Sequence, residues 1–507
     1  MPSLHWTGKD KAVVAAREVP YRPLIAEPRL GYGDPDNENL LIWGDNLDAL
    51  KSLLPVYAGR VKCIFIDPPY NTRSAFEHYD DNREHSIWLS LMYPRLELLR
   101  ELLSEDGSIW VTIDDNEGHY LKVVMDEVFA RSNFVADAFW QKTATRENRT
   151  DFSSVHDHVF VYAKQRSVWS EIRNPLTATE EQLSRFTNPD NDPRGAWASL
   201  PAHAKAEKGR RQAQFFSVTT PSGRTVDPPP GRCWLYTEPR FEEMIADNRI
   251  WFGENGNNVP RVKKFLSEVQ AGLVPSTFWA YKEVGTNAQA KLEIVNLFPG
   301  DVPFSTPKPE ALISRAIHIG TNPGDLVLDS FLGSGTTAAV AHKMGRRWIG
   351  VEMGDHAETH CAARLRKVID GEQGGISQAV GWQGGGGFRF CRLGEPVFDG
   401  HGSIRPGVGF ADLAQWIWYR ETRQPLGQVP GSPLLGVHQG TAFYLLFNGI
   451  LGDRRPDGGN VLTAPVLEAL PAHDGPRVVF GEACRLHDSR LAALGVRFKQ
   501  LPYQANG

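Results

Sequence analysis

The sequence predicts an α/β fold: a doubly wound, Rossmann-like sheet interrupted by an inserted, less regular domain. Two observations support this prediction. Strand and helix patterns alternate over residues 39–165 and again over 301–370, which is typical of a mainly parallel sheet covered by helices. In addition, two of the buried strand patterns lead directly into unusual turns, and ligands bind at such strand ends in this fold class.

The first stretch, residues 39–165, contains the first of these turns. Its patterns are a strand over 40–43, a helix, a strand over 61–66, a helix over 87–106, a strand over 108–115, a helix over 118–129 and a strand over 158–164. Gly107 is expected to end the helix over 87–106. The strand over 61–66 is apolar on both faces and runs into the sequence DPPY, here called the DPPY turn (residues 67–70).

The second stretch, residues 301–370, contains the other turn. Its patterns are a helix over 308–320, a strand over 325–331, the sequence LGSGTT over 332–337, a helix over 338–345 and a strand over 346–353. The sequence LGSGTT is here called the glycine turn (residues 332–337). Glycines let a backbone approach a ligand closely, and the start of the helix beyond them favours a negative group.

The glycine turn by itself leaves two kinds of ligand open, and a purely structural turn between strand and helix is a further alternative. Gly333, Gly335 and the acid Glu352 after the next strand satisfy a loose dinucleotide-binding fingerprint. An NAD-type oxidoreductase is therefore one alternative. The same kind of loop also serves S-adenosylmethionine (AdoMet), in which a carboxylate takes the place of the phosphate.

Four further segments complete the expected organisation. They are an N-terminal extension over 1–38, an inserted domain over 166–300, a glycine-rich linker over 371–387 and a C-terminal mixed α/β domain over 388–507. Residues 203–265 contain eleven Lys or Arg against seven Asp or Glu, whereas residues 101–127 contain eight acids and one Lys. Because local potential steers association, a polyanionic partner would meet the inserted domain.

Composition excludes several classes of protein. The 41% hydrophobic and 23% charged residues are ordinary for a globular chain. The five cysteines are scattered without a CxxC pair, which argues against a disulfide framework and a cysteine metal site. No secretory segment and no apolar run of membrane-spanning length is evident, so we expect a cytoplasmic protein.

The DPPY turn and the sequence FLGSGT together resemble the DNA amino-methyltransferases. Their order along the chain is the permuted order of the β class, and the acid of DPPY favours adenine N6, with cytosine N4 as the alternative. The sequences GDNLDALKSLL, LLSEDGSIWVTIDDNE, HDHVFVYAK and FSTPKPEALI also resemble the Mod subunits of type III restriction–modification systems. The resemblance covers most of residues 40–368 and implies AdoMet as cofactor and double-stranded DNA as substrate.

The residue types of the DPPY turn suit methylation of an exocyclic amine. The resemblance implies that the Asp67 carboxylate and the Pro68 carbonyl accept the two amine hydrogens and draw the nitrogen toward a nucleophilic geometry. Pro69 lacks an N–H, and both prolines stiffen the loop. Tyr70 offers a ring on which an extruded base can stack. Neither a covalent nucleophile nor a metal is expected.

The resemblance also implies a set of AdoMet-binding residues. Asp45 would accept a hydrogen bond from the cofactor's adenine amine, although helix capping by Asp45 or Asn46 is the alternative. Asp329 would meet the amino group, and Glu352 the ribose hydroxyls. The remaining implied contacts are Phe331, Gly333, Gly335, Thr336 for the carboxylate and, unless it is an ordinary solvated lysine, Lys308.

The inserted domain would then recognise DNA. Lysine and arginine side chains can contact phosphates, and loop asparagines or arginines can read base edges. A solvated surface position is the alternative for each of these residues. The candidate phosphate contacts are Lys205, Lys208, Arg210, Arg211, Lys263 and Lys264.

Partners are expected from the resemblance as well. The sequence contains no GxxxxGK[ST] motif, so a helicase motor is not expected within it. If the protein serves restriction, a separate helicase–nuclease chain would supply cleavage. A homodimer is expected, with residues 388–507 as a candidate interface, and the location would be the nucleoid of a bacterial or archaeal cytoplasm.

Overall fold

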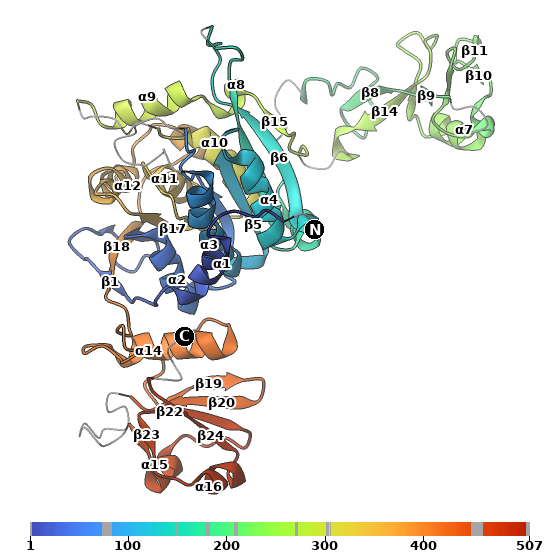
Figure 1. The fold of residues 1–507 in the computed structure, drawn as a ribbon. Coiled ribbons are helices and arrows are strands. Elements are labelled where there is room, and N and C mark those ends of the chain that lie inside the picture. The colour runs from blue at the N-terminus through green and yellow to red at the C-terminus, as the bar shows by residue number, and fades with distance from the viewer. Residues whose placement is uncertain are drawn as a thin grey trace. The chain divides into compact units, whose positions relative to one another are not determined.

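The computed structural model describes residues 3–72, 84–148, 150–177, 183–206, 211–268, 272–300, 304, 306–447 and 460–502. The chain divides into two units (Figure 1). The larger unit comprises Met1–Asn174 and Ser276–Gly507, and the smaller one, here called the inserted unit, comprises Pro175–Pro275. Among the described residues, no helix combines the length and the apolar character that crossing a membrane requires.

One mixed sheet forms the centre of the larger unit. From edge to edge its strands are β1 (Leu24–Ala26), β18 (Gly387–Leu393), β3 (Leu40–Trp43), β17 (Arg347–Glu352), β16 (Leu326–Asp329), β4 (Val61–Ile66), β5 (Leu103–Ile113), β7 (His156–Ala163), β6 (Phe134–Gln141) and β15 (Phe278–Trp279), with β2 (Tyr32–Gly33) beside β18. The strands from β18 to β5 are parallel, whereas β7 is antiparallel to both β5 and β6. The expected α/β fold is confirmed.

The middle of the sheet joins two segments that are far apart in the sequence. β4 lies between β5, which follows it in the chain, and β16, which comes after the inserted unit. Leu328 of β16 pairs with Ile64 of β4 in parallel register, so both strands end at the same edge of the sheet. The DPPY turn and the glycine turn therefore leave the sheet side by side, where ligand sites occur in this fold class.

Helices cover both faces of this sheet (Figure 1). The helices α1 (Lys9–Glu18), α2 (Asn46–Tyr57), α3 (His85–Leu102) and α4 (Gly118–Phe129) share a buried core with alternate strand residues such as Ile64 and Ile66. Burial of such a side chain contributes about 1.5–3 kcal/mol. α3 ends at Leu102 instead of reaching Gly107, because β5 begins directly at Leu103.

The opposite face carries α10 (Glu310–Gly320), α11 (Thr336–Lys343) and α12 (Ala363–Ile369), the last preceded by a π-helical turn (Ala357–Ala362). Successive strand residues point to opposite faces, so Cys63 lies under α10 while Ile64 lies on the other side. Gly320 makes this contact close: a β-carbon there would lie 3.1 Å from Ser108 Oγ. The glycine lets α10 lie directly on the strands that carry the DPPY turn.

The inserted unit has a small core of its own. Its strands are β8 (Trp197–Pro201), β9 (His203–Lys205), β10 (Val218–Thr219), β11 (Thr225–Val226), β12 (Arg232–Trp234), β13 (Ile250–Trp251) and β14 (Arg261–Phe265), and its helices include α7 (Glu238–Ala246). The buried rings of Trp234 and Phe241 have centroids 5.5 Å apart.

The inserted unit is shorter than the expected domain over 166–300. The helix α5 (Arg166–Ile172) before it belongs to the larger unit, as do β15, α8 (Tyr281–Val284) and α9 (Asn287–Leu297) after it. β15 extends the main sheet by pairing in parallel with β6. Residues 276–300 therefore return to the main sheet earlier than the change in sequence pattern indicates.

The glycine-rich segment over 371–387 is packed, unlike the expected linker. It contains α13 (Ser377–Val380), whose Ser377 is buried, and the Trp382 indole N–H donates to the carbonyl of Val368 at 2.8 Å. β18 then joins the main sheet beside β3. The C-terminal part follows with α14 (Phe410–Thr422), α15 (Ala464–Ala469), α16 (Asp488–Ala493) and the strands β19 (Leu434–His438), β20 (Thr441–Leu445), β21 (Val461–Leu462), β22 (Arg477–Gly481), β23 (Ala483–Cys484) and β24 (Val496–Gln500).

Candidate active site

The DPPY turn presents its acid at the end of β4. The hydroxyl of Thr112, on the neighbouring strand β5, donates to Asp67 Oδ1 at 2.6 Å. Lys308, which lies just before α10, forms an ion pair with Asp67 Oδ2. The side chain of Asp67 is 22% exposed. The carboxylate is thus held in place by one donor from β5 and one from the segment before α10, while it remains open to a ligand.

The rest of the DPPY turn is held by its surroundings. The indole N–H of Trp88, on α3, donates to the carbonyl of Pro69 at 2.7 Å. Asn71 follows in the left-handed region, with φ of 60°, and its amide donates to the buried Glu117 at 2.6 Å. Asparagine tolerates this conformation better than most residues. The chain therefore leaves the turn in a fixed direction.

Tyr70 is joined to a buried ion pair. Its hydroxyl donates to Asp157 Oδ2 at 3.4 Å, and Lys142 Nζ donates to Asp157 Oδ1 at 2.6 Å. Burial raises the pKa of Asp157, although Lys142 and Lys308 act in the opposite direction. Burial likewise raises the pKa of the Tyr70 phenol, so the ring remains neutral. These contacts hold the ring of Tyr70 at the edge of the site.

The glycine turn is arranged around Glu352. Gly333 and Gly335 have φ of 56° and 80°, which only glycine adopts readily, and Gly335 leads into α11. Glu352 accepts the Gly333 N–H at 2.7 Å, and its other carboxylate oxygen lies 3.0 Å from His356 Nε2. Burial alone would raise the pKa of Glu352, but His356 and the loop amides outweigh it and the pKa is lowered. The anionic Glu352 thus stabilises the glycine turn by accepting the Gly333 N–H. Its contact with a ribose stays a prediction.

Asp329 is the buried acid of the glycine turn. Its Oδ1 accepts the Phe331 N–H at 2.9 Å, and its Oδ2 accepts the Thr337 hydroxyl at 2.6 Å. Burial nevertheless raises the pKa of Asp329 to about 7. The hydroxyl of the neighbouring Thr336 accepts from Arg364 at 2.8 Å. A cationic group brought to Asp329 would favour its ionised form.

Both turns line a single cavity of about 400 Å³. This volume lies within the range of about 300–1,000 Å³ typical of small-molecule sites. Nine of the residues predicted for catalysis and cofactor binding line it: Asp67, Pro68, Pro69, Tyr70, Lys308, Asp329, Phe331, Gly333 and Thr336. Lys142, Asp157 and Asp114 also line it and were not predicted.

Three predicted cofactor residues, Asp45, Gly335 and Glu352, are not among those that line the cavity. Asp45 caps α2, since its Oδ1 accepts the Leu47 N–H at 2.8 Å, and it forms an ion pair with Arg95 at 3.2 Å. The capping alternative is therefore observed, and a contact between Asp45 and an adenine amine stays a prediction. Lys308 is not a solvated lysine, because its side chain is 10% exposed and bound to Asp67.

The predicted DNA contacts fall into three groups. Lys205, Arg211 and Lys264 are exposed on the inserted unit, whereas Lys208 and Arg210 lie outside the described residues. The predicted phosphate contact of Lys263 is wrong, because the side chain is 0% exposed and forms ion pairs with Asp190 and Asp192. A lysine in this position neutralises buried acids and is not available to a phosphate.

Comparisons with known proteins identify the family of the chain. The family model described as DNA methylase, for N6 and N4 methyltransferases, matches residues 61–362 and so includes both turns. The StyLTI Mod subunit of a type III restriction–modification enzyme from Salmonella typhimurium is 33% identical, over 66% of this chain and 55% of that protein. A probable HindVI Mod subunit from Haemophilus influenzae is 34% identical, over 70% of this chain and 54% of that protein. The chain spans about half the length of these relatives.

Similarity to solved structures is weaker. The PvuII DNA methyltransferase, described as cytosine-N4-specific, is 15% identical with a TM-score of 0.36, over 68% of this chain and 93% of that one. A match at this level carries no inference about this chain. The family model, by contrast, extends from the start of β4 to the end of the π-helical turn and covers more than half of the sequence. The chain therefore belongs to the DNA methylase family of N6 and N4 methyltransferases.

Proposed function

We propose that the chain is a site-specific DNA methyltransferase that transfers a methyl group from AdoMet to the N6 amine of an adenine flipped out of double-stranded DNA. The observation that supports this proposal most directly is the shared cavity. The acid of the DPPY turn and the backbone of the glycine turn face the same space of about 400 Å³. An amine on Asp67 and a cofactor on Gly333 would thus meet within one pocket.

The residues of the glycine turn fit AdoMet. Asp329 is a buried carboxylate that a cationic amino group would ionise, and Phe331 offers an apolar surface beside Gly333. Gly333 lets the backbone approach closely, and Thr336 lies at the start of α11, where a carboxylate is favoured. When bound, AdoMet supplies a methyl group on a positively charged sulfur, which is already a good leaving group. The protein's task is therefore mainly positioning.

The DPPY turn would orient the amine. Asp67 and the Pro68 carbonyl would accept its two hydrogens, so that the nitrogen lone pair is no longer shared fully with the ring. Asp67 already receives hydrogen bonds from Thr112 and Lys308, and this argues for an orienting acceptor more than a strong base. The surplus proton leaves the nitrogen after methyl transfer. Tyr70, held by Asp157, would support the base from the side.

Adenine is preferred over cytosine because of the acid in the DPPY turn, while the family itself includes both specificities. The test is incubation of the purified chain with DNA and AdoMet labelled in the methyl group, followed by nucleoside analysis. Label in N6-methyladenine is expected. Label in N4-methylcytosine would replace the adenine proposal, and an absence of label would contradict the proposed activity. The NAD-type alternative is dropped, since the family model includes the glycine turn.

We also propose the partners that this activity needs. The exposed Lys205, Arg211 and Lys264 would contact the phosphates of double-stranded DNA, in the cytoplasm where the nucleoid lies. Two kinds of assembly are proposed as well: a homodimer, and association with a separate helicase–nuclease subunit. Light scattering of the purified chain tests the first. Copurification with a tagged helicase–nuclease chain encoded beside it tests the second.

A further inference from the structure

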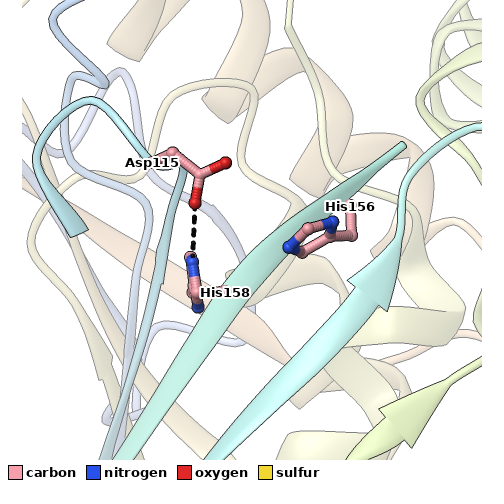
Figure 2. Close-up of side chains that lie close together, drawn as sticks. All are labelled: Asp115, His156 and His158. Carbon is pink, nitrogen blue, oxygen red and sulfur yellow. Dashed lines mark hydrogen bonds and ion pairs between the residues drawn. The ribbon is translucent and has the colours of Figure 1, made fainter. Parts of the chain in front are cut away.

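A second group of polar side chains lies after the end of β5 and at the start of β7 (Figure 2), and the proposed methyl transfer does not use it. Asp115 follows β5, whereas His156 and His158 are alternate residues on β7 and so share one face of the sheet. One ligand atom from each of the three residues lies within 4.8 Å of the others. His158 is buried, His156 is half-buried and Asp115 is exposed. The group thus has a fixed base and an open side.

A carboxylate from the next strand fixes the orientation of the buried imidazole. The Nδ1 atom of His158 lies 3.0 and 3.1 Å from the two carboxylate oxygens of Asp137, on β6. The Nε2 atom of His158 faces Asp115 Oδ1 at 3.0 Å. His158 can therefore donate from Nδ1 to one carboxylate while Nε2 faces a second acid and a second imidazole. Histidines that ligate metals commonly have this arrangement, because the carboxylate fixes the orientation of the ring.

We propose that Asp115, His156 and His158 bind a divalent transition-metal ion of the zinc class. Two imidazoles and one carboxylate form a donor set that suits zinc, with bonds of about 2.0–2.2 Å. Ligand atoms within 4.8 Å of one another reach such distances by small side-chain movements. His119 is a candidate for a fourth position, because its ring centroid lies 5.9 Å from that of His158 and it stands near the start of α4.

The ion would connect two strand ends that also serve the cavity. Asp114 precedes Asp115, and Asp157 stands between His156 and His158. Because neighbouring residues of a strand point to opposite faces, ligation of both histidines on one face holds Asp157 toward the other. Asp157 in turn accepts from Tyr70 and Lys142. The proposed ion is therefore a structural one that keeps β5 and β7 together behind the cavity.

The experiment uses the full chain after chelation and dialysis, titrated with Co²⁺ and followed by its visible absorption, and with Zn²⁺ by calorimetry. One saturable site per chain is expected. His156→Asn and Asp115→Asn should each lower the affinity at least about tenfold, since each removes a ligand. The matched control is His438→Asn, a half-buried histidine at the end of β19, which should bind the metal like the wild type.

Thermal unfolding distinguishes a variant that has lost the metal site from one that has lost its fold. Zn²⁺ should raise the Tm of the wild type and of His438→Asn but not that of His156→Asn, because a ligand stabilises only the state that binds it. Absence of a saturable Co²⁺ site in the wild type would overturn the proposal. So would equal affinities of the wild type, His156→Asn and Asp115→Asn. In either case His158 would simply be a protonated bridge between Asp115 and Asp137.

Discussion

Lys308 forms an ion pair with Asp67, although the whole inserted unit separates the two residues in the sequence. The Lys308 Nζ atom also lies 4.9 Å from the centre of the Tyr70 ring. The ammonium group therefore contacts both the proposed amine acceptor and the proposed stacking ring. A base that enters the DPPY turn must share Asp67 with Lys308 or displace it.

Replacement of Lys308 should separate its two possible roles. Lys308→Met removes a charged hydrogen bond to Asp67, which is worth about 1.5–3 kcal/mol, so methyl transfer should fall about 10–100-fold. AdoMet affinity, measured by calorimetry, should change little. Lys291→Met is the control, because Lys291 lines the same cavity and is exposed. A large loss of AdoMet affinity in Lys308→Met would favour the sequence-based role at the cofactor carboxylate.

Asp67→Ala should nearly abolish methyl transfer while the chain still binds AdoMet. Loss of one preorganised hydrogen-bonding group in an active site costs about 10²–10³-fold in rate. Single-turnover assays with labelled AdoMet measure the rate, and calorimetry measures the binding. Asp67→Asn serves as the variant of matched shape, since it can still accept from Thr112. Near-normal turnover in Asp67→Ala would show that the carboxylate does not orient the amine.

Asp45→Ala should destabilise the chain through α2. Removal of a helix N-cap costs about 1 kcal/mol, which thermal or urea unfolding detects. Asp45→Ser should restore most of this stability, because serine also caps helices, but it lacks the carboxylate. The pair therefore tests the predicted contact with the AdoMet adenine. Weak AdoMet binding by a stable Asp45→Ser variant would support that contact, and normal binding would leave Asp45 with capping alone.

Asp329 should make stability depend on pH. Its native pKa of about 7 is above the value of about 4 in an unfolded chain. The native state thus keeps a proton that the unfolded chain releases, so the free energy of unfolding should fall as the pH rises from about 4 to 7, by a few kcal/mol at most. The Asp329→Asn variant should lack this fall when its free energy of unfolding is plotted against pH beside that of the wild type. Parallel curves would show that Asp329 is ionised throughout.

The neighbouring lysines Lys263 and Lys264 should behave differently. Lys263→Met leaves Asp190 and Asp192 without their buried cation, and this should cost the inserted unit about 3–5 kcal/mol of stability. Lys264→Ala, at an exposed position, should leave stability unchanged. It should weaken DNA binding and reduce the salt slope by about one. An unchanged salt slope in Lys264→Ala would remove it from the proposed DNA contacts.

The two turns could be predicted from the sequence because each depends on local pattern. An apolar strand that ends on DPPY or on a glycine turn can be recognised from its local sequence, and the parallel sheet brings the ends of the two strands together. The contacts of Thr112 and Asp157 could not be predicted in the same way. The Thr112 contact depends on β5 lying beside β4 in parallel register, and the Asp157 contacts depend on β7 pairing with β5 and β6, whereas the sequence shows only the order of these strands. A hint was present in HDHVFVYAK, where an acid interrupts the start of an apolar strand.

The errors also have physical causes. Lys263 and Lys264 alternate along β14, so one of them had to face inward, but the acids that receive it come from a distant loop. The role of Lys308 at the cofactor was implied by the resemblance and stays a prediction, while its long side chain reaches Asp67 in the same cavity. The boundary at residue 300 was placed too late because β15 is short and its apolar pattern is weak.

The central pairing of β4 with β16 has a consequence for how the chain folds while it is being synthesised. During synthesis, β3 and β4 leave the ribosome long before β16 and β17, their partners in the finished sheet. Until the inserted unit and the glycine turn have followed, β4 has an unpaired edge and Asp67 has no Lys308. Domains tend to fold as they emerge, but this one must wait for its last strands. A ribosome that stalls before residue 326 would therefore hold a chain with an incomplete sheet and no cofactor site.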